Sequence, residues 1–318
     1  MKRSAKNTVS LVGVGVIGRG WMRVFSSAGY RTQIYDENRL QVQGAVAWLE
    51  ESLFQDIRDG LISQKEAEKC LKLIYVHDDF HQALAGADYV QESGPERLEL
   101  KQAIFDEMDR GSDSQAILAS STSGLDINAI TEGIKGANRC IMAHPFNPPH
   151  VTPVVEILPT AKTAHAVTER TMNLLTEAGQ KPVLLNCFIP GFLGNRLQAA
   201  VMREAIHLVE KGVAGVEAVD AVMSHGLGLR WAVLGVFGVN NTNADGGVRE
   251  YYQRYGEAYI RWMNDLDPNP PSFSPEMIEM IAHGVEHMEG EATVQEICTW
   301  RDRLLRNILH LKEKDPHP

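Results

Sequence analysis

Three glycines near the N-terminus constrain this chain more than any other feature. Gly13, Gly15 and Gly18 follow directly on an apolar run and open a stretch with helical periodicity. In a strand–turn–helix unit the first glycine permits the tight turn, the second lets the backbone approach a pyrophosphate, and the third lets helix and strand pack closely. The helix would begin at Val16 and Ile17, where N–H donors and the positive end of the dipole favour an anion. An isolated match to this pattern also occurs in ordinary glycine-rich turns, but this context predicts a dinucleotide site.

The residue that ends the second expected strand indicates which dinucleotide binds. Asp36 stands where a carboxylate can accept hydrogen bonds from the ribose hydroxyls of the adenosine half. The same negative charge would repel the 2′-phosphate of NADP, so the sequence favours NAD. Arg39 lies close enough to weaken this argument, and we interpret it as a solvated charge at the start of a helix.

Hydrophobic periodicity predicts two domains of different class. Up to residue 188, short β-branched runs alternate with helical stretches such as Ala45 to Asp59 and Leu98 to Arg110, which is typical of a Rossmann-type, doubly wound parallel sheet. The expected strands are Thr8 to Val12, Thr32 to Tyr35, Leu73 to Val76, Asp88 to Gln91, Ala116 to Ser120, Cys140 to Ala143, Val154 to Ile157 and Pro182 to Asn186. From residue 189 the β signal disappears, and an all-helical domain is expected over 189–318.

Charge and composition exclude several classes of function. The 318 residues include 41 acidic and 31 basic side chains, so the field around the protein repels polyanions and a nucleic-acid partner is not expected. The four cysteines are scattered without metal-ligand spacing, which predicts no metal site and fits a reducing cytoplasm. Because no continuous apolar run approaches the roughly 20 residues that span a bilayer, no membrane partner is expected.

One histidine stands apart from the other ten. His144 follows an expected strand and precedes a proline-rich segment, so it lies at the sheet edge where open α/β sheets bind ligands. Glu156 lies in the next apolar strand, where an unpaired buried carboxylate is costly. A His–Glu pair, in which the glutamate orients the ring, explains both residues; the alternative is a glutamate that caps backbone N–H groups at the edge of the core.

These features together resemble the 3-hydroxyacyl-CoA dehydrogenase family, and the resemblance extends through both domains. The matching segments are the glycine loop, Glu92-Ser93-Gly94-Pro95-Glu96-Arg97 with Lys101, Ser120-Ser121-Thr122-Ser123-Gly124-Leu125, His144-Pro145-Phe146-Asn147-Pro148, Val155-Glu156-Ile157, and Pro190-Gly191-Phe192-Leu193-Gly194-Asn195-Arg196-Leu197.

The resemblance implies a role for each matching position. His144 would be the general base, Glu156 its partner, Ser123 a hydrogen-bond donor to the substrate oxygen, and Asn195 an amide that positions the substrate. Alternatively, residues 120–123 form a helix N-cap cluster and Asn195 caps its own helix.

The resemblance also concerns the cofactor and the assembly. It implies that Glu96, Lys101 and Ser121 lie near the nicotinamide end of NAD. The helical second domain of the family resembles a dimerisation platform, so a homodimer is expected.

The second domain carries the clues to the substrate. Arg230, followed by Trp231, looks like the lambda-crystallin (L-gulonate 3-dehydrogenase) and carnitine dehydrogenase branches, whose substrates are free acids. An arginine suits a carboxylate, so Arg230 is the candidate anchor, with a salt bridge between domains or subunits as the alternative. For a trimethylammonium group, an aromatic cage is available from Trp231, Phe237, Tyr251 and Tyr252, which are alternatively core or interface residues.

The sequence therefore predicts an NAD-dependent dehydrogenase that oxidises the 3-hydroxyl of a small hydroxy acid to the 3-keto acid. An L-gulonate-like substrate is favoured, followed by carnitine and then a short 3-hydroxyacyl-CoA. The alternative from another class is a crystallin-like structural or redox-sensing protein that binds NAD.

Overall fold

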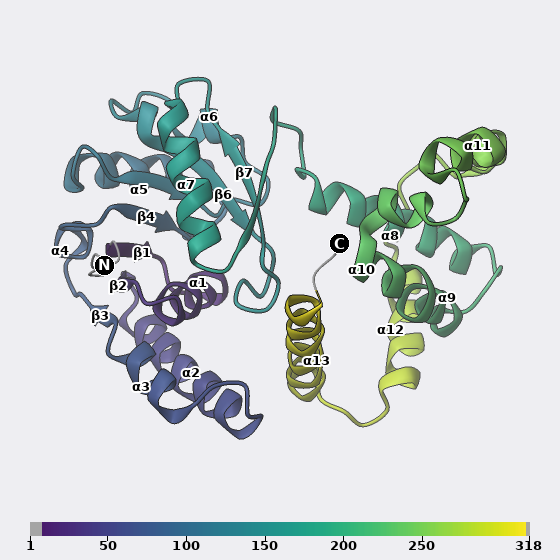
Figure 1. The fold of residues 1–318 in the computed structure, drawn as a ribbon, viewed down its shortest axis with the longest axis horizontal. Helices are drawn as coiled ribbons and strands as arrows, with labels where there is room; N and C mark the ends of the chain where they lie inside the picture. The colour runs from purple at the N-terminus through teal and green to yellow at the C-terminus, as the bar shows by residue number, and fades with distance from the viewer. Residues whose placement is uncertain (1–7, 316–318) are drawn as a thin grey trace. The chain divides into compact units, whose positions relative to one another are not determined.

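The chain forms two compact units in a computed structural model that describes residues 8–315 (Figure 1). The first unit ends at Leu193 and the second begins at Gly194, five residues beyond the predicted boundary (193 minus 188). Phe192 accounts for the difference, because its side chain is buried in a hydrophobic cluster of the first unit together with Leu185.

The first unit is built on one eight-stranded sheet, as predicted. The strands lie in the order β3-β2-β1-β4-β5-β6-β7-β8, so the order reverses between β1 and β4 as in a doubly wound fold. Every run predicted as a strand overlaps one of them, and the Rossmann-type class is confirmed. The bounds are β1 (Thr8–Val12), β2 (Arg31–Tyr35), β3 (Ile74–Val76), β4 (Tyr89–Glu92), β5 (Ile117–Ser120), β6 (Cys140–Pro145), β7 (Val154–Pro159) and β8 (Lys181–Leu184).

The sheet is not parallel throughout, which the sequence did not indicate. The strand β7 runs antiparallel to β6, and β8 pairs in parallel with β7. Residues 146–153 connect β6 to β7 and are too few for the crossover helix that a parallel connection needs. A second difference is that β6 continues through Pro145, so His144 lies inside the strand rather than after it.

Helices cover both faces of the sheet and create two buried clusters. Val9 and Leu11 of β1 pack with α1, α2, α3 and α7, whereas Val12 packs with α4, α5 and α6 on the other face. The helices are α1 (Val16–Ser27), α2 (Arg39–Arg58), α3 (Gln64–Leu71), α4 (Phe80–Leu84), α5 (Leu98–Gly111), α6 (Ile127–Ile130), the 3₁₀ turn η1 (Ala137–Arg139) and α7 (His165–Glu177).

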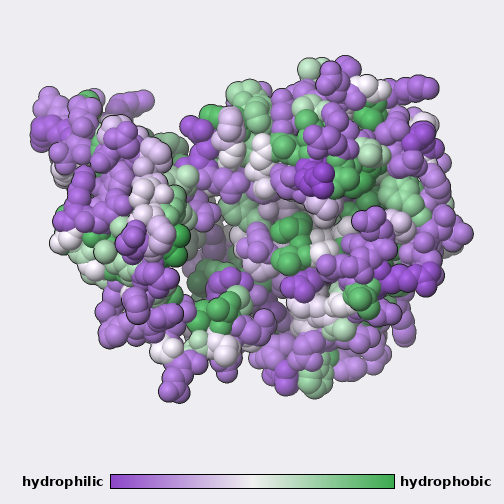
Figure 2. Space-filling view, turned by 180° about the vertical axis from the view of Figure 1, so that it is seen from behind, coloured by the Kyte–Doolittle hydropathy of each residue, from purple (hydrophilic) through white to green (hydrophobic). Residues whose placement is uncertain are grey.

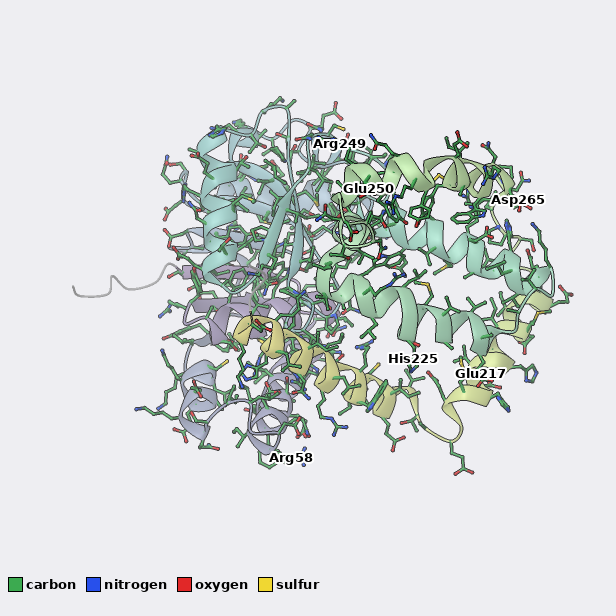
Figure 3. All side chains as sticks on the ribbon, turned by 45° about the vertical axis from the view of Figure 1, so that its right-hand side comes forward. Arg58, Glu217, His225, Arg249, Glu250 and Asp265 are labelled. Atoms are coloured by element: carbon green, nitrogen blue, oxygen red, sulfur yellow. The ribbon has the colours of Figure 1, made fainter. Side chains whose placement is uncertain are left out.

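The second unit contains only helices within the described residues, as predicted. In Figure 3, Glu250 lies near the start of α11 and Asp265 at its end. A second proline-rich stretch, which contains Pro268, Pro270 and Pro271, separates α11 from α12. Ser274 caps α12, and Pro275 lies in its first turn. The elements are α8 (Gly194–Glu210), α9 (Val216–Val222), the π-helical turn η2 (Met223–Leu227), α10 (Gly228–Asn241), α11 (Gly247–Asp265), α12 (Pro275–Glu289) and α13 (Val294–Lys314).

One stretch of the second unit is unusually apolar and exposed. Val216–Asn241 is long and apolar enough to cross a membrane by length and composition, and 6% of its most apolar window is buried. Gly235 interrupts the helical backbone with a φ of 69°. Figure 2 shows hydrophobic side chains reaching the surface in patches among hydrophilic ones. Such patches on a protein surface often mark interaction sites.

Candidate active site

Three neighbouring strands end together at the carboxyl edge of the parallel part of the sheet. Val12 of β1 pairs with Glu92 of β4, and Glu92 pairs with Ser120 of β5. The next residues along these strands are Gly13, Ser93 and Ser121. In open α/β sheets ligands bind at this edge, where the strand order reverses.

The glycine loop leaves room for a ligand beside the start of α1. Gly13 has a φ of 89°, and a Cβ on Gly18 would lie 1.9 Å from the Gly13 carbonyl oxygen, so both positions require glycine. A Cβ on Gly15 would meet nothing within 4 Å. No side chain caps the start of α1, whose first two residues are Val16 and Ile17. Since the first N–H groups of a helix need an acceptor, this end of α1 fits the pyrophosphate of a dinucleotide.

Asp36 lies beside this loop at the end of β2. Its two carboxylate oxygens accept hydrogen bonds from the N–H groups of Val14, at 3.0 Å, and Asn38, at 2.9 Å. A pocket of about 300 Å³ includes Asp36 and Gly13 in its lining. Glu37 adds negative charge there, and exposed Arg39 pairs with Asp78 at 3.3 Å. These carboxylates disfavour an additional 2′-phosphate, as the sequence argument for NAD anticipated.

His144 and Glu156 face each other directly across the antiparallel strands β6 and β7. The imidazole Nδ1 lies 2.8 Å from one Glu156 oxygen, and the other oxygen accepts the N–H of Leu193 at 2.8 Å. Both side chains are buried, and the imidazole packs against Phe146 and Phe192, with ring centroids 6.1 and 5.6 Å away. Phe192 has a φ of 49°, a left-handed conformation that its buried ring holds in place. A carboxylate on Nδ1 leaves Nε2 as the basic nitrogen.

Glu96 fixes the loop that carries Ser123. One Glu96 oxygen accepts the Thr122 hydroxyl at 2.6 Å and the N–H groups of Ser123 and Gly124 at 2.9 and 3.0 Å. Burial raises the pKa of Glu96, but these hydrogen bonds and the charge of Lys101 together hold it below its usual value. Ser123 itself is exposed. The N-cap of α6 is Asp126, so the serine cluster does not cap that helix.

Lys101 forms an ion pair with Glu92, a residue to which the sequence argument gave no role. Its Nζ lies 2.7 and 3.0 Å from the two oxygens of Glu92, and both side chains are almost fully buried. Glu92 also accepts the Gly94 N–H at 2.6 Å and the Ser120 hydroxyl at 2.6 Å. Lys101 therefore stabilises the loop that carries Glu96, whose second oxygen lies 3.5 Å from Nζ. Its direct contact with a cofactor stays a prediction.

Ser121 belongs to a different set of contacts. Its Oγ accepts hydrogen bonds from Trp21 Nε1 at 3.1 Å and Gln91 Nε2 at 2.7 Å, and lies 2.9 Å from the Ser93 Oγ. Trp21 and Gln91 are buried. Neither was predicted to lie near the site, because Gln91 meets Ser121 only through the pairing of β4 with β5 and Trp21 only through the packing of α1.

The remaining predicted residues belong to the second unit. Asn195 lies in the first turn of α8, and Arg230 lies in the first turn of α10. Arg230 is exposed, and no carboxylate described in the second unit lies within salt-bridge distance of it. Tyr251 is buried, and its hydroxyl lies 2.7 Å from that of Tyr259. Its ring centroid is 5.5 Å from that of Tyr252, so these aromatic side chains pack on each other.

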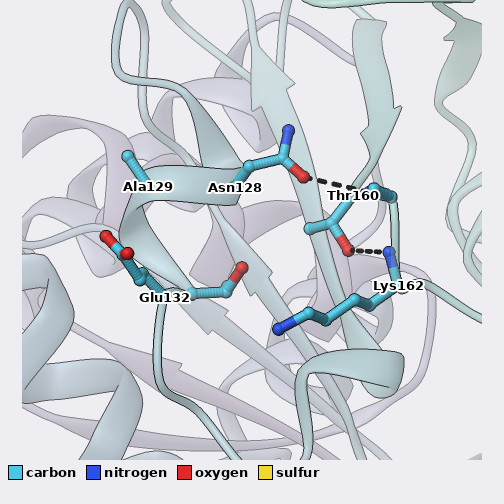
Figure 4. Close-up of a pocket in the computed structure, with 7 residues that line it drawn as sticks. Asn128, Ala129, Glu132, Thr160 and Lys162 are labelled. Atoms are coloured by element: carbon cyan, nitrogen blue, oxygen red, sulfur yellow. Dashed lines mark hydrogen bonds between the residues drawn. The ribbon is translucent and has the colours of Figure 1, made fainter.

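A second pocket of the first unit lies apart from this edge. It has a volume of about 330 Å³ and is lined by residues of α6, of the turn that follows α6, and of the loop after β7. Asn128 Oδ1 accepts the N–H of Ala161, and Thr160 Oγ1 accepts that of Lys162, so these polar groups satisfy one another (Figure 4). Across the part of the chain that the structure describes, no group of three or more His, Cys, Asp or Glu is arranged to hold a metal ion.

Comparison with known proteins identifies the family of this chain. The model described as the 3-hydroxyacyl-CoA dehydrogenase NAD binding domain matches residues 8–187, and the C-terminal domain model matches residues 191–294. A lambda-crystallin homolog from Bos taurus is 38% identical, covering 98% of both chains. An L-carnitine dehydrogenase from Nocardiopsis dassonvillei is 32% identical, covering 98% of this chain and 93% of that protein.

A solved structure supports the same assignment. The structure of 5-formyl-3-hydroxy-2-methylpyridine 4-carboxylic acid 5-dehydrogenase, described as an NAD⁺-dependent dismutase, matches with a TM-score of 0.78 at 25% identity, covering 96% of this chain and 97% of that one. The cofactor predicted from the glycine loop and Asp36 is confirmed by the NAD-binding model over residues 8–187. The chain therefore belongs to the 3-hydroxyacyl-CoA dehydrogenase family and is an NAD-dependent oxidoreductase that acts on CH–OH groups.

Proposed function

We propose that this enzyme oxidises the 3-hydroxyl of a small hydroxy acid to the 3-keto acid. The observation that carries the proposal is the buried His144–Glu156 pair on β6 and β7, in the same sheet as the glycine loop. NAD supplies the hydride acceptor when it is bound at that loop. L-Gulonate is the first candidate substrate, L-carnitine the second and a short 3-hydroxyacyl-CoA the third.

His144 acts as the general base in this proposal. Glu156 holds Nδ1 as the protonated nitrogen, so the Nε2 lone pair accepts the proton of the substrate hydroxyl as the C3–H bond breaks. The imidazolium that results is stabilised by the same carboxylate, which also accepts a hydrogen bond from the Leu193 N–H.

Ser123 and Asn195 hold the oxygen atoms of the substrate. The loop of Ser123 is anchored by Glu96, which leaves the serine exposed at the sheet edge rather than packed in the core. The Ser123 hydroxyl donates to the same Glu96 oxygen at 3.3 Å, and in this proposal it donates to the substrate oxygen instead once the substrate is bound. Asn195 contributes its side-chain amide from the first turn of α8.

Arg230 binds the substrate carboxylate. Its exposure, and the lack of an acidic partner among the described residues of the second unit, support this role over a salt bridge within that unit. An arginine can form two parallel hydrogen bonds with a carboxylate, which a lysine cannot. The bovine relative, named a lambda-crystallin homolog, supports the L-gulonate branch, and the L-carnitine dehydrogenase at 32% identity supports the alternative. The packing of Tyr251 against other tyrosines argues against its place in an aromatic cage for carnitine.

The experiment that tests the substrate is NADH formation at matched concentrations of L-gulonate, L-carnitine and 3-hydroxybutyryl-CoA, with NADP beside NAD. Turnover confined to a free acid supports the proposal and identifies the branch. Turnover of the CoA ester alone contradicts the role of Arg230 and leaves that of His144 intact. If NADH binds and none of the three reacts, the result favours the non-catalytic alternative, an NAD-binding structural protein.

We also propose that the protein is a homodimer assembled through its helical unit. Leu229 and Val233 lie one helical turn apart on α10 before the break at Gly235, Phe237 follows the break, and each of the three is at least 60% exposed. Trp300, Leu304 and others form a similar exposed stripe on α13. Apolar stripes of this kind are buried when two copies of a chain associate. A membrane surface is the competing occupant of the Val216–Asn241 stretch.

A further inference from the structure

We propose that Ser93 is a cofactor-binding residue. Its hydroxyl donates a hydrogen bond to an acceptor oxygen in the pyrophosphate–ribose part of NAD, and a buried network fixes the direction of that donation. The inference rests on the dinucleotide site described above and adds to it a side chain for which neither the sequence argument nor the family match provides a role.

The network begins with Gln91, whose orientation is fixed by two neighbours. The Tyr89 hydroxyl lies 2.5 Å from Gln91 Oε1, and Gln91 Nε2 lies 3.2 Å from the carbonyl oxygen of Ala143. A backbone carbonyl only accepts hydrogen bonds, so the amide NH₂ group must face it. The second hydrogen of that NH₂ group points to Ser121 Oγ, 2.7 Å away.

Ser121 passes this orientation on to Ser93. Its oxygen accepts from Gln91 Nε2 and from Trp21 Nε1, which can only donate. A hydroxyl has two acceptor positions and one hydrogen, so the acceptor positions of Ser121 are filled and its hydrogen goes to Ser93 Oγ at 2.9 Å. Ser93 therefore receives a hydrogen bond and keeps its own hydrogen. Among residues 8–315 that hydrogen has no acceptor.

The position of Ser93 indicates which acceptor it serves. Its N–H donates to the carbonyl of Val12, the residue before the glycine loop, at 2.8 Å. A Cβ on Gly13 would lie 2.8 Å from the Ser93 carbonyl oxygen, and one on Gly18 would lie 3.7 Å from the Ser93 Cβ. Ser93 thus lies against the loop that a pyrophosphate approaches, and it is only partly buried. Phosphate and ribose oxygens accept hydrogen bonds, so a donor with a fixed direction favours them.

The test is equilibrium binding of NADH, ADP-ribose and adenosine to wild type and Ser93→Ala, followed by NADH fluorescence and by calorimetry. Loss of one hydrogen bond to a charged or hydroxyl acceptor weakens NADH and ADP-ribose about tenfold. Adenosine, which carries no phosphate and occupies only the part of the site near Asp36, binds the variant as it binds wild type. Ser27→Ala, an exposed serine at the end of α1, is the matched control and changes none of the three.

A double-mutant cycle tests whether the network acts through Ser93. Ser121→Ala removes the partner that orients Ser93 and weakens NADH by a smaller factor, whereas in the Ser93→Ala background the same change has no further effect. Ser93→Cys, which keeps the size of the side chain but donates weakly, gives an intermediate affinity and covers the case in which the alanine variant is unstable.

Other outcomes of these experiments would contradict the proposal. Unchanged NADH affinity in Ser93→Ala, or an equal loss for adenosine, overturns the proposal for Ser93. Additive effects of Ser93→Ala and Ser121→Ala overturn the directed network. Failure of the dinucleotide site itself is distinguishable, because wild type would then bind neither NADH nor adenosine.

Discussion

The two units bury their apolar side chains to very different extents. In the first unit, every residue of β4, β5 and β6 is buried. In the second unit, α9 and α13 have no buried residue, and α10, α11 and α12 have one each. The first unit therefore contains a complete core and the pair His144–Glu156, whereas much of the apolar surface of the second unit is exposed. This difference underlies the proposals that the first unit carries the chemistry and that the second carries assembly and substrate choice.

The largest expected effect lies in the first unit. His144→Gln removes the base while keeping a polar side chain of similar size, so we expect kcat to fall by about a thousandfold. NADH affinity should stay within a few fold of wild type. Steady-state kinetics and NADH titration check both expectations, with His165→Gln, an exposed histidine at the start of α7, as the control. Activity within a few fold of wild type would sink the assignment of the base.

The next effect concerns assembly through the second unit. Phe237→Glu places a charge on the exposed stripe of α10, where the native ring is 74% exposed. We expect sedimentation analysis to show a dimer for wild type and a monomer for the variant at the same micromolar concentration, because an unpaired charge is costly in an apolar interface. Leu40→Glu, at a 75% exposed position of α2, should remain dimeric.

Two results would contradict this part of the comparison. A wild type that sediments as a monomer, or a Phe237→Glu variant that stays dimeric, removes the proposed interface. Flotation of wild type with phospholipid vesicles would instead assign the exposed stripe to a membrane surface.

A smaller effect is expected for Arg230, where a substitution should change the KM of the substrate and leave kcat almost unchanged. Arg230→Lys keeps the charge and loses the bidentate geometry, so KM for a free-acid substrate should rise about tenfold while kcat changes little. Arg249→Lys, in the first turn of α11, is the matched control. An unchanged KM in the Arg230 variant would favour a structural role for this arginine.

The smallest effect is a dependence of stability on pH within the first unit. The pKa of Glu96 is lowered in the folded state, so its stabilising contribution is present above the unfolded value of about 4.3 and is lost as the pH falls through the folded value. We therefore expect wild type to unfold at a higher temperature than Glu96→Gln at pH 7. The difference should shrink below about pH 4. A gap that is the same at both pH values would show that the charge of Glu96 is not what stabilises its loop.

The sequence predicted those parts of the fold that depend on local pattern. The glycine loop, Asp36 and the eight strands are each recognised from a short stretch of sequence, and the structure contains all of them. His144 and Glu156 were expected to meet because one follows an apolar strand and the other lies in the next apolar strand, and they do. The reversal at β7 was missed, because an apolar strand has the same pattern in either direction.

Features that depend on register between distant segments could not be predicted. The partners of Glu92 come from β5 and α5, and Trp21 and Gln91 reach Ser121 only when α1, β4 and β5 are assembled. No spacing in the sequence indicates that Lys101 is buried against Glu92 rather than exposed to a ligand. The hydrogen-bond partners of a buried polar side chain are thus the least predictable part of this site.

Leu193 is the last residue before the helical unit, and its N–H is bound to Glu156. The carboxylate that holds the His144 ring is thus also the acceptor for the backbone at the point where the first unit ends. A substitution that shifts the backbone at Leu193 therefore changes one of the hydrogen bonds that fix this carboxylate. The orientation of the His144 imidazole thus depends on a backbone segment that lies far along the chain from β6 and β7.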